Sequence, residues 1–379
     1  MRMPLPVFER ECEDIADMRK AIGDGLEKGE CFIKESGTAL RFLTAFFAVA
    51  PPAGTVTCIK CSGRLAQRPL DGLIDALVEL GMSRPKIEMK GGVKSIFIPA
   101  SPLHGGRIKV SSSLTSQFVS ALLLIAPSLS GSLRLEGNYE SLPYVRMTAA
   151  LMRRCGAKVH VTTDFIEVAN LPYRNLDAAE NVEADWSAAS FFYEYVALNG
   201  EAPLLLKNLR SHESLQGDAR WLPRLFYDLG VTTDDEGEGT LIDRFPSRTV
   251  YSRYDLSSCP DLVMPYIVTC CFAGTNFRLR NIGTLRHKES DRISAMVTAM
   301  RGMGFVLREE GEKENPVLVW SGERCEPLPL GSRLEDASDH RIAMAIEAAA
   351  RGYHAAHPEC VDKSFPGFYD ELKKLTEKR

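Results

Sequence analysis

Four glycines that follow amphipathic segments recur at an almost constant spacing. Gly156 lies 75 residues after Gly81, Gly230 lies 74 residues after Gly156, and Gly304 lies 74 residues after Gly230. A glycine directly after an amphipathic helix suits a left-handed C-terminal cap. Fixed spacing over this length is typical of duplicated structural modules. The sequence therefore predicts a chain built from repeated modules, which restricts the fold more than any other feature.

Each module is predicted to run strand, helix, strand, helix and then two strands. The pattern is clearest in one stretch, with strands at 107–110 and 132–135, helices at 115–127 and 142–155, and a hairpin of 158–162 and 165–168. This order indicates an α/β class with a mixed sheet in every module. The chain has 379 residues, which exceeds what one core usually supports, so two domains are expected.

The two ends of the chain do not fit whole modules. A similar helix end at Ile22-Gly23 lies only 58 residues before Gly81, and only about one helix precedes it. Residues 368–375 read as a helix with no strand after it. We therefore expect the N-terminal part of the first module to be missing, or strands to be shared between the ends.

Composition excludes several classes of protein. The formal net charge is −4, which argues against a general nucleic-acid binder. No signal sequence is visible, and no apolar run reaches the roughly 20 residues of a membrane helix. The ten cysteines lack paired spacing, as expected for reduced cytoplasmic thiols. Cys58 and Cys61 form a C-x-x-C without a second pair, so no metal site is expected.

A dense charge cluster occupies residues 286–292, at a predicted strand-to-helix junction. Helix starts offer unpaired backbone N–H groups to anions. Lys288 and Arg292 would add positive charge, while Glu289 and Asp291 could carry protons. The alternative is a solvated helix start with local ion pairs only.

Other polar clusters also precede predicted helices, each with an ordinary alternative. Residues 35–41 could bind an anion through Gly37 and Arg41, or form a Ser/Thr cap. Arg68 could bind a carboxylate or phosphate in a fork, or face solvent. Residues 111–117 carry more hydroxyl groups than one cap uses, which favours a phosphate or polyol. Further clusters lie at 183–190, 259–261, 338–341 and 363–366. Modules that aim their helix N-termini at one cleft would form an anion site without a metal.

These clusters together resemble the 5-enolpyruvylshikimate-3-phosphate synthase (3-phosphoshikimate 1-carboxyvinyltransferase) family. The matching stretches span nearly the whole chain in the family's order: 37–41, 67–69, 115–118, 185–190, 260–261, 286–292, 339–341 and 363–366. The resemblance implies the enolpyruvyl transferase fold, an inside-out α/β barrel with similar domains at 1–183 and 184–379. It also implies transfer of the enolpyruvyl group of phosphoenolpyruvate to the 5-hydroxyl of shikimate 3-phosphate, in aromatic amino acid biosynthesis. No cofactor, metal, membrane or nucleic acid is expected, and we expect a cytoplasmic monomer.

The resemblance also assigns residues to each substrate. It implies that shikimate 3-phosphate is bound by Thr115, Ser116, Gln117, Ser141, Tyr144, Asp261 and Lys288. It implies that phosphoenolpyruvate is bound by Gly37, Arg41, Arg68, Gln117, Arg292, Arg341 and Lys363. Asp261 would accept the proton of the attacking hydroxyl, Lys288 would bridge the substrates, and Glu289 would protonate the methylene carbon.

One departure from the family leaves alternatives open. The family's opening lysine-serine-x-serine-asparagine-arginine stretch, which contacts both substrates, does not occur in this sequence. Loss of such cations from a closed cleft could cost several kcal/mol of binding or transition-state stabilisation. We expect either that the start of the chain is misassigned or removed, or that the protein is a catalytically impaired relative that binds shikimate 3-phosphate. A third alternative is a transferase for a nucleotide sugar. Thr115, Ser116 and Gln117, with residues 286–292, follow the shikimate pattern instead of the nucleotide-sugar one.

Overall fold

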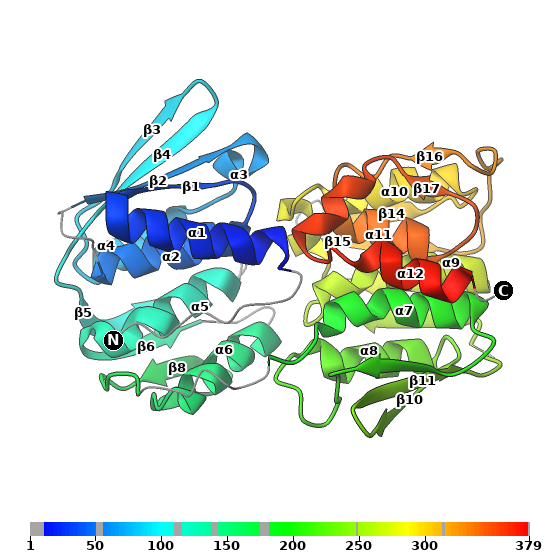
Figure 1. Cartoon of the computed structure of the whole chain (residues 1–379), viewed down its shortest axis with the longest axis horizontal. Helices are drawn as coiled ribbons and strands as arrows, with labels where there is room; N and C mark the ends of the chain where they lie inside the picture. Colours follow the sequence, from blue (N-terminus) through cyan, green and yellow to red (C-terminus); the bar gives the residue numbers. More distant parts are fainter. Residues whose placement is uncertain are drawn as a thin grey trace. The chain divides into compact units, whose positions relative to one another are not determined.

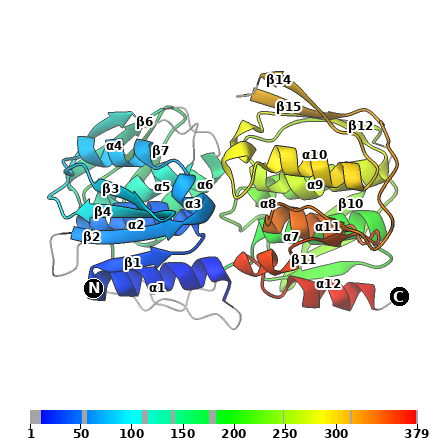
Figure 2. The same cartoon turned by 90° about the horizontal axis from the view of Figure 1, so that it is seen from above.

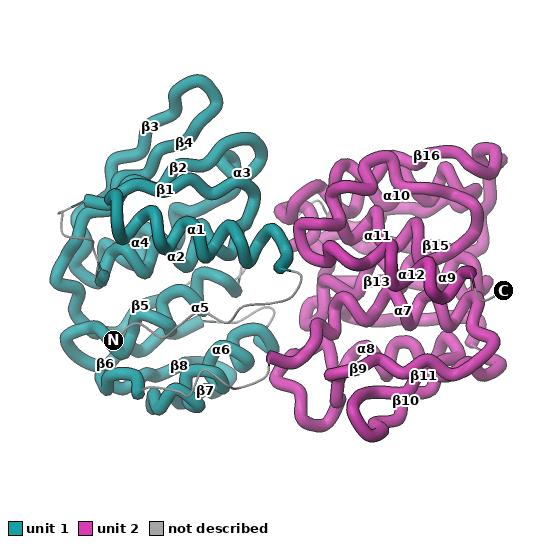
Figure 3. The backbone as a smooth tube through the Cα atoms, viewed as in Figure 1, with its two compact units in different colours: residues 1–180 teal, residues 181–379 magenta. Residues whose placement is uncertain are grey.

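The computed structural model describes residues 11–50, 56–109, 116–137, 142–174, 182–247, 249–312 and 315–377. The chain divides into two compact units, residues 1–180 and 181–379, coloured separately in Figure 3. The boundary expected from the sequence, after residue 183, falls just beyond this division. Each unit has its own core of buried apolar side chains.

Unit 1 alternates short strands with helices of one to four turns. Its elements are α1 (Glu13–Lys28), β1 (Glu30–Ile33), α2 (Gly37–Val49), β2 (Val56–Ser62), α3 (Gly63–Gln67), α4 (Asp71–Glu79), β3 (Lys86–Lys90), β4 (Val93–Pro99), β5 (His104–Lys109), α5 (Ser116–Ile125), η1 (Ala126–Ser128), β6 (Ser130–Glu136), α6 (Leu142–Arg154), β7 (Val159–Val161) and β8 (Phe165–Val168).

Unit 2 follows the same alternation. Its elements are α7 (Trp186–Asn199), β9 (Leu204–Lys207), α8 (Asp218–Tyr227), β10 (Val231–Glu236), β11 (Gly239–Arg244), β12 (Tyr251–Asp255), η2 (Pro260–Leu262), α9 (Val263–Ala273), β13 (Asn276–Arg280), η3 (Gly283–His287), α10 (Arg292–Gly302), β14 (Arg308–Glu312), β15 (Asn315–Trp320), β16 (Arg333–Leu334), α11 (His340–Ala348), β17 (His354–Ala355), η4 (Pro358–Lys363) and α12 (Phe368–Thr376).

The sheets repeat one topology. Three four-stranded sheets have the orders β1-β2-β4-β3, β5-β6-β8-β7 and β12-β13-β15-β14. In each, the first two strands are parallel, and the closing hairpin adds two antiparallel strands. The predicted module order is therefore confirmed in these three modules, and so is the α/β class. Within the described ranges, the two other sheets are shorter, with the orders β10-β11-β9 and β16-β17.

The repeated glycines take the backbone conformation expected of helix caps. Their φ angles are 106° at Gly81, 85° at Gly156, 89° at Gly230 and 88° at Gly304, all in the left-handed region. The predicted helix end at Gly23 is wrong. Helix α1 continues through Gly23 to Lys28, and β1 begins directly after the left-handed cap at Gly29. A glycine inside a helix costs only about 1 kcal/mol, which the rest of α1 can offset.

Three helices of unit 2 are buried on nearly all sides. Helices α7, α9 and α11 pack against one another, on the inner side of the sheets (Figures 1 and 2). They are apolar around most of their circumference, as buried helices are. In unit 1, α2 packs against α5 in a similar way. Within the parts of the chain that the structure describes, no helix is both long and apolar enough to cross a membrane.

The C-x-x-C pair lies on a single strand. Cys58 and Cys61 both belong to β2, where residues three apart point to opposite faces of the sheet. Both thiols are buried, and burial raises the pKa of each. They are therefore unreactive thiols placed back to back across the sheet.

Candidate active site

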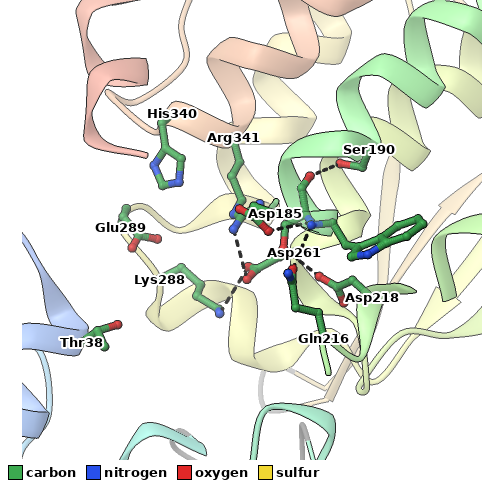
Figure 4. Close-up of polar contacts among 12 residues, drawn as sticks. Thr38, Asp185, Ser190, Gln216, Asp218, Asp261, Lys288, Glu289, His340 and Arg341 are labelled. Atoms are coloured by element: carbon green, nitrogen blue, oxygen red, sulfur yellow. Dashed lines mark hydrogen bonds and ion pairs between the residues drawn. The ribbon is translucent and has the colours of Figure 1, made fainter. Parts of the chain in front are cut away.

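Asp261 is the centre of a network of charged side chains in unit 2. It lies in η2, which leads into the buried helix α9. One carboxylate oxygen, Oδ1, is 2.9 Å from Nη1 of Arg292 and 3.4 Å from Nζ of Lys288. The other, Oδ2, is 3.3 Å from Nη2 of Arg341 (Figure 4). The carboxylate of Asp261 therefore gathers three cations.

These cations control the ionisation of Asp261. Burial alone would raise the pKa of this carboxyl group. Arg341, Lys288 and Arg292 outweigh burial and hold the pKa of Asp261 well below its usual value. Asp261 is therefore a carboxylate at neutral pH. It can accept a proton readily only when some of these cations form ion pairs with another anion instead.

Arg292 is shared by three carboxylates. Its side chain is 1% exposed, at the first residue of α10. Besides Asp261, its guanidinium lies 2.7 Å from Oε2 of Glu289 and 2.8 Å from Oδ2 of Asp339. Burial opposes the charge, but the carboxylates, Asp339 foremost, raise the pKa of Arg292. The three carboxylates therefore keep Arg292 charged despite its burial.

The charge cluster of residues 286–292 serves two purposes. Arg286 pairs with Asp291 at 2.8 Å and also with Glu309, which matches the local ion pairs of the simpler alternative. Asp291 caps α10 by accepting a hydrogen bond from the backbone N–H of Ser294. Lys288, Glu289 and Arg292 instead contact residues far away in sequence. The first group positions the junction, and the second forms the site.

Glu289 links this network to the end of η4. Its Oε1 lies 3.6 Å from Nζ of Lys363, while Oε2 contacts Arg292. Lys363 is buried at the last residue of η4. A second carboxylate thus lies among the same cations as Asp261.

The start of α11 joins the network through Asp339. This buried residue caps the helix by accepting a hydrogen bond from the backbone N–H of Arg341 at 3.1 Å. Its Oδ2 also accepts a hydrogen bond from Oγ of Ser290 at 2.9 Å. Burial would raise the pKa of Asp339, but Arg292 outweighs this and lowers it. Next to it, burial lowers the pKa of His340 to about 4, so this imidazole is neutral at pH 7.

Asp218, the first residue of α8, is a second carboxyl group near Asp261. It is 2% exposed, and its Oδ2 accepts a hydrogen bond from Oγ of Ser187 at 2.7 Å (Figure 4). Ser187 belongs to the first turn of α7, which Asp185 caps. Burial, followed by the charge of Asp261, raises the pKa of Asp218 to about 7. Two neighbouring carboxyl groups with pKa values moved in opposite directions are characteristic of catalytic sites.

In unit 1, two arginines converge on the start of α2. Helix α2 begins at Gly37, because Ser36 caps it by accepting a hydrogen bond from the backbone N–H of Ala39. A Cβ atom on Gly37 would lie 2.6 Å from Nη1 of Arg41 and closer still to Nη1 of Arg68. Any side chain at position 37 would require both guanidinium groups to move away from this helix N-terminus. Within residues 35–41, Ser36 therefore forms the cap, whereas Gly37 and Arg41 belong to the candidate anion site.

Helix α5 also contributes to the unit 1 cluster. Nε2 of Gln117 donates a hydrogen bond to Oγ1 of Thr38, the second residue of α2, at 2.8 Å. Ser116 is the first residue of α5, and Tyr144 lies in the first turn of α6, which packs against α5. The other two predicted ligands of shikimate 3-phosphate, Thr115 and Ser141, lie outside the described residues.

The geometry brings most predicted site residues into two groups. Gly37, Arg41, Arg68 and Gln117 gather in unit 1, whereas Asp261, Lys288, Glu289, Arg292, Arg341 and Lys363 gather in unit 2. Unit 1 presents cations and hydrogen-bond donors at a helix start. Unit 2 adds carboxylates that can exchange protons. Together the residue types suit anionic substrates that undergo proton transfer.

Comparison with known proteins decides the family. The sequence model of EPSP synthase (3-phosphoshikimate 1-carboxyvinyltransferase) matches residues 11–372. The chain belongs to the EPSP synthase family. It is 36% identical over 370 residues to the 3-phosphoshikimate 1-carboxyvinyltransferase of Bacteroides fragilis, covering 96% of this chain and 87% of the relative. It is 31% identical to the one from Dehalococcoides mccartyi, covering 92% and 79%.

Solved structures agree with the enolpyruvyl transferase fold. An EPSP synthase from Acinetobacter baumannii superposes with a TM-score of 0.64 at 19% identity, covering 91% of this chain and 78% of that one. The enolpyruvyl transferase NikO from Streptomyces tendae gives 0.60 at 16% identity, covering 89% and 76%. At these identities the likeness concerns the fold alone, and it confirms the predicted fold class.

Sequence reasoning missed two acids of this EPSP synthase family member. Asp218 received no role, and Asp339 appeared only as part of a motif. The repeat offered a signal for Asp218, because it begins the second helix of its module, as Arg292 does in the next one. For Asp339, the signal was its position just before an apolar helix, where capping is expected.

Proposed function

We propose that this chain transfers the enolpyruvyl group of phosphoenolpyruvate to the 5-hydroxyl of shikimate 3-phosphate. In the addition step, the hydroxyl oxygen bonds to C2 of phosphoenolpyruvate, the hydroxyl proton leaves, and C3 gains a proton. In the elimination step, C3 loses a proton and the C2–O bond to phosphate breaks. The products are 5-enolpyruvylshikimate 3-phosphate and phosphate. The observation that carries this proposal is the Asp261 carboxylate held among Lys288, Arg292 and Arg341.

Asp261 is assigned as the base for the 5-hydroxyl. Its pKa is low because Arg341, Lys288 and Arg292 surround it. We assign Arg341 and Arg292 to phosphoenolpyruvate, and Lys288 to a bridge between the two substrates. When anionic substrates draw these cations away, the pKa of Asp261 rises towards that of an effective base. Substrate binding would thus activate the proton acceptor.

Glu289 is assigned as the proton donor to C3. Its Oε1, which Lys363 contacts at 3.6 Å, is the oxygen that we assign to proton transfer. Lys363 would turn to phosphoenolpyruvate on binding. During elimination the two carboxyl groups act in reverse: Glu289 takes the proton back from C3, and Asp261 gives its proton to the leaving phosphate oxygen.

The remaining assignments concern unit 1. Gly37, Arg41 and Arg68 are assigned to phosphoenolpyruvate, because two guanidinium groups at a helix N-terminus favour phosphate or carboxylate. Thr115, Ser116, Ser141 and Tyr144 are assigned to shikimate 3-phosphate, and Gln117 to both substrates.

The experiment that tests the proposal measures phosphate release from phosphoenolpyruvate by the purified chain. Release is expected only with shikimate 3-phosphate present, with a product of the mass of 5-enolpyruvylshikimate 3-phosphate. Binding of shikimate 3-phosphate without turnover would identify a catalytically impaired relative. Equal turnover with a nucleotide sugar as acceptor would overturn the substrate assignment.

A further inference from the structure

Asp336 is a fully buried carboxylate outside the network described above. It lies between β16 and α11, with 0% of its surface exposed. Its Oδ1 accepts hydrogen bonds from the backbone N–H of Ser338 at 2.8 Å and from Nδ1 of His357 at 2.7 Å. Its Oδ2 accepts a third from the backbone N–H of His357 at 2.8 Å. One side chain thus ties together two segments about 20 residues apart.

The first segment is a strained turn that leads to Arg341. Ala337 and Ser338 have φ angles of 54° and 53°, in the left-handed region that residues with a side chain rarely adopt. The backbone N–H of Asp339 donates to the carbonyl of Asp336 at 2.9 Å, which closes the turn. Without the bond from Ser338 to Asp336, this conformation would lose its main side-chain support. The turn sets where α11 begins, and therefore where Arg341 points.

The second segment leads to Lys363. His357 is the residue before η4, and the whole of η4 is only six residues long. The backbone of His357 is held by Asp336, and its carbonyl accepts a hydrogen bond from the N–H of Cys360 at 3.1 Å. Lys363, the last residue of η4, contacts Glu289. A short helix fixed at its start leaves its last residue little freedom.

We propose that Asp336 is a positioning residue that fixes Arg341 and Lys363 relative to each other through its bonds to Ser338 and His357. Both cations contact carboxylates of the candidate site, Asp261 and Glu289. Asp336 touches neither cation, so it acts only through the turn and through η4. The link to phosphoenolpyruvate binding rests on the proposed function, in which both cations bind that substrate.

The charges around His357 strengthen this link. Its hydrogen bond to Asp336 raises the pKa of His357, and Glu335 and Glu359 add to the effect. A protonated imidazole donates a stronger hydrogen bond to a carboxylate than a neutral one does. Replacing Asp336 by asparagine would leave one acceptor oxygen where the aspartate has two. The amide nitrogen in place of Oδ2 cannot accept from the backbone N–H of His357, and the remaining neutral oxygen accepts more weakly from Ser338 and from the imidazole, so the hold on both segments weakens.

The test compares Asp336→Asn with the control Glu326→Gln, which changes an exposed carboxylate elsewhere in unit 2. In steady-state kinetics, Asp336→Asn is expected to raise the KM for phosphoenolpyruvate about 10-fold and to change the KM for shikimate 3-phosphate less than about 2-fold. In hydrogen exchange, the peptides covering residues 336–341 and 357–363 are both expected to exchange faster. His357→Ala, which keeps the backbone bond, should give a smaller change in the same direction.

The outcomes separate this inference from the proposed function. An unchanged KM for phosphoenolpyruvate, or faster exchange in only one of the two segments, overturns the positioning role. An equal rise in both KM values with a lower melting temperature also overturns it, since that is general loosening. If the wild-type chain shows no turnover, the proposed function fails, and the exchange experiment alone decides whether Asp336 couples the two segments.

Discussion

The two units differ in what they bury. Within the described ranges, every buried carboxyl group lies in unit 2: Glu194, Asp218, Asp336 and Asp339. The buried polar residues of unit 1 are hydroxyl-bearing residues and Arg41, which donates to the carbonyls of Gly37 and Pro69. These bonds orient the guanidinium group of Arg41 at the start of α2. In the proposed function, unit 1 contributes binding of anions, whereas unit 2 contributes proton transfer and sensitivity to pH.

Asp261→Asn should break the proton-transfer role of unit 2. Removal of a general base typically costs 10²- to 10⁴-fold, so we expect kcat to fall about 10³-fold. Binding of shikimate 3-phosphate should stay within about 3-fold of wild type, because most of its assigned ligands are unchanged. Steady-state assays of phosphate release would measure kcat, and calorimetric titration would measure the affinity for shikimate 3-phosphate.

The control for this variant is Asp234→Asn, which changes an exposed aspartate on β10 of the same unit. It should leave both quantities unchanged. A kcat for Asp261→Asn within 10-fold of wild type would refute the assignment of the base.

Asp218→Asn should remove part of the pH dependence of stability that unit 2 contributes. Burial and Asp261 raise the pKa of Asp218 to about 7 from 3.8, so the folded chain keeps a proton that the unfolded chain releases above about pH 4. Wild-type stability therefore falls as pH rises from about 4 to 7. Asparagine does not titrate and can still accept from Ser187. Relative to wild type, the variant should gain about 3 kcal/mol of unfolding free energy between pH 5 and pH 8.

Urea unfolding at the two pH values measures this gain. Asp164→Asn, an exposed substitution in unit 1, provides the reference and should follow wild type at both. Parallel stability curves for Asp218→Asn and wild type would show that Asp218 is ionised in the folded chain, against our expectation.

Gly37→Ala should weaken the anion site of unit 1 without changing the chemistry. The added methyl group would displace the guanidinium groups of Arg41 and Arg68. Overpacking of this kind costs about 1–3 kcal/mol, so the KM for phosphoenolpyruvate should rise roughly 10-fold or somewhat more. The pH dependence of kcat should not move, because no titrating group of unit 2 is affected.

Gly23→Ala is the matched control for Gly37→Ala. It lies inside α1, where an added Cβ meets nothing within 4 Å. Its kinetics should equal those of wild type, with a small gain in helix stability. A shift in the pH profile of Gly37→Ala would contradict the division of roles between the units.

The sequence predicted the repeated architecture because helix caps and strand alternation are local properties. Gly81 and Gly304 need left-handed φ angles whatever surrounds them, and the module containing α5 and α6 follows the expected strand and helix order closely. The same local reasoning failed at Gly23, since tertiary packing of α1 outweighs one unfavourable residue.

The site was predicted in part, and the missing part depends on distant contacts. Arg41, Asp261 and Arg341 were found because they belong to recognisable clusters at helix starts. The roles of Asp218 and Asp336 depend on hydrogen bonds to Ser187 and His357, which lie 31 and 21 residues away in the chain. Burial and partnership of this kind arise only when the chain folds, so the residue type alone could not reveal them.

Arg292 and its three carboxylate neighbours limit how this chain can change during evolution. Replacing Arg292 would leave the buried carboxylate of Asp339 without its guanidinium partner, and loss of one partner of a buried ion pair typically costs about 3–5 kcal/mol. A substitution at Arg292 is therefore costly unless the carboxylates around it change as well.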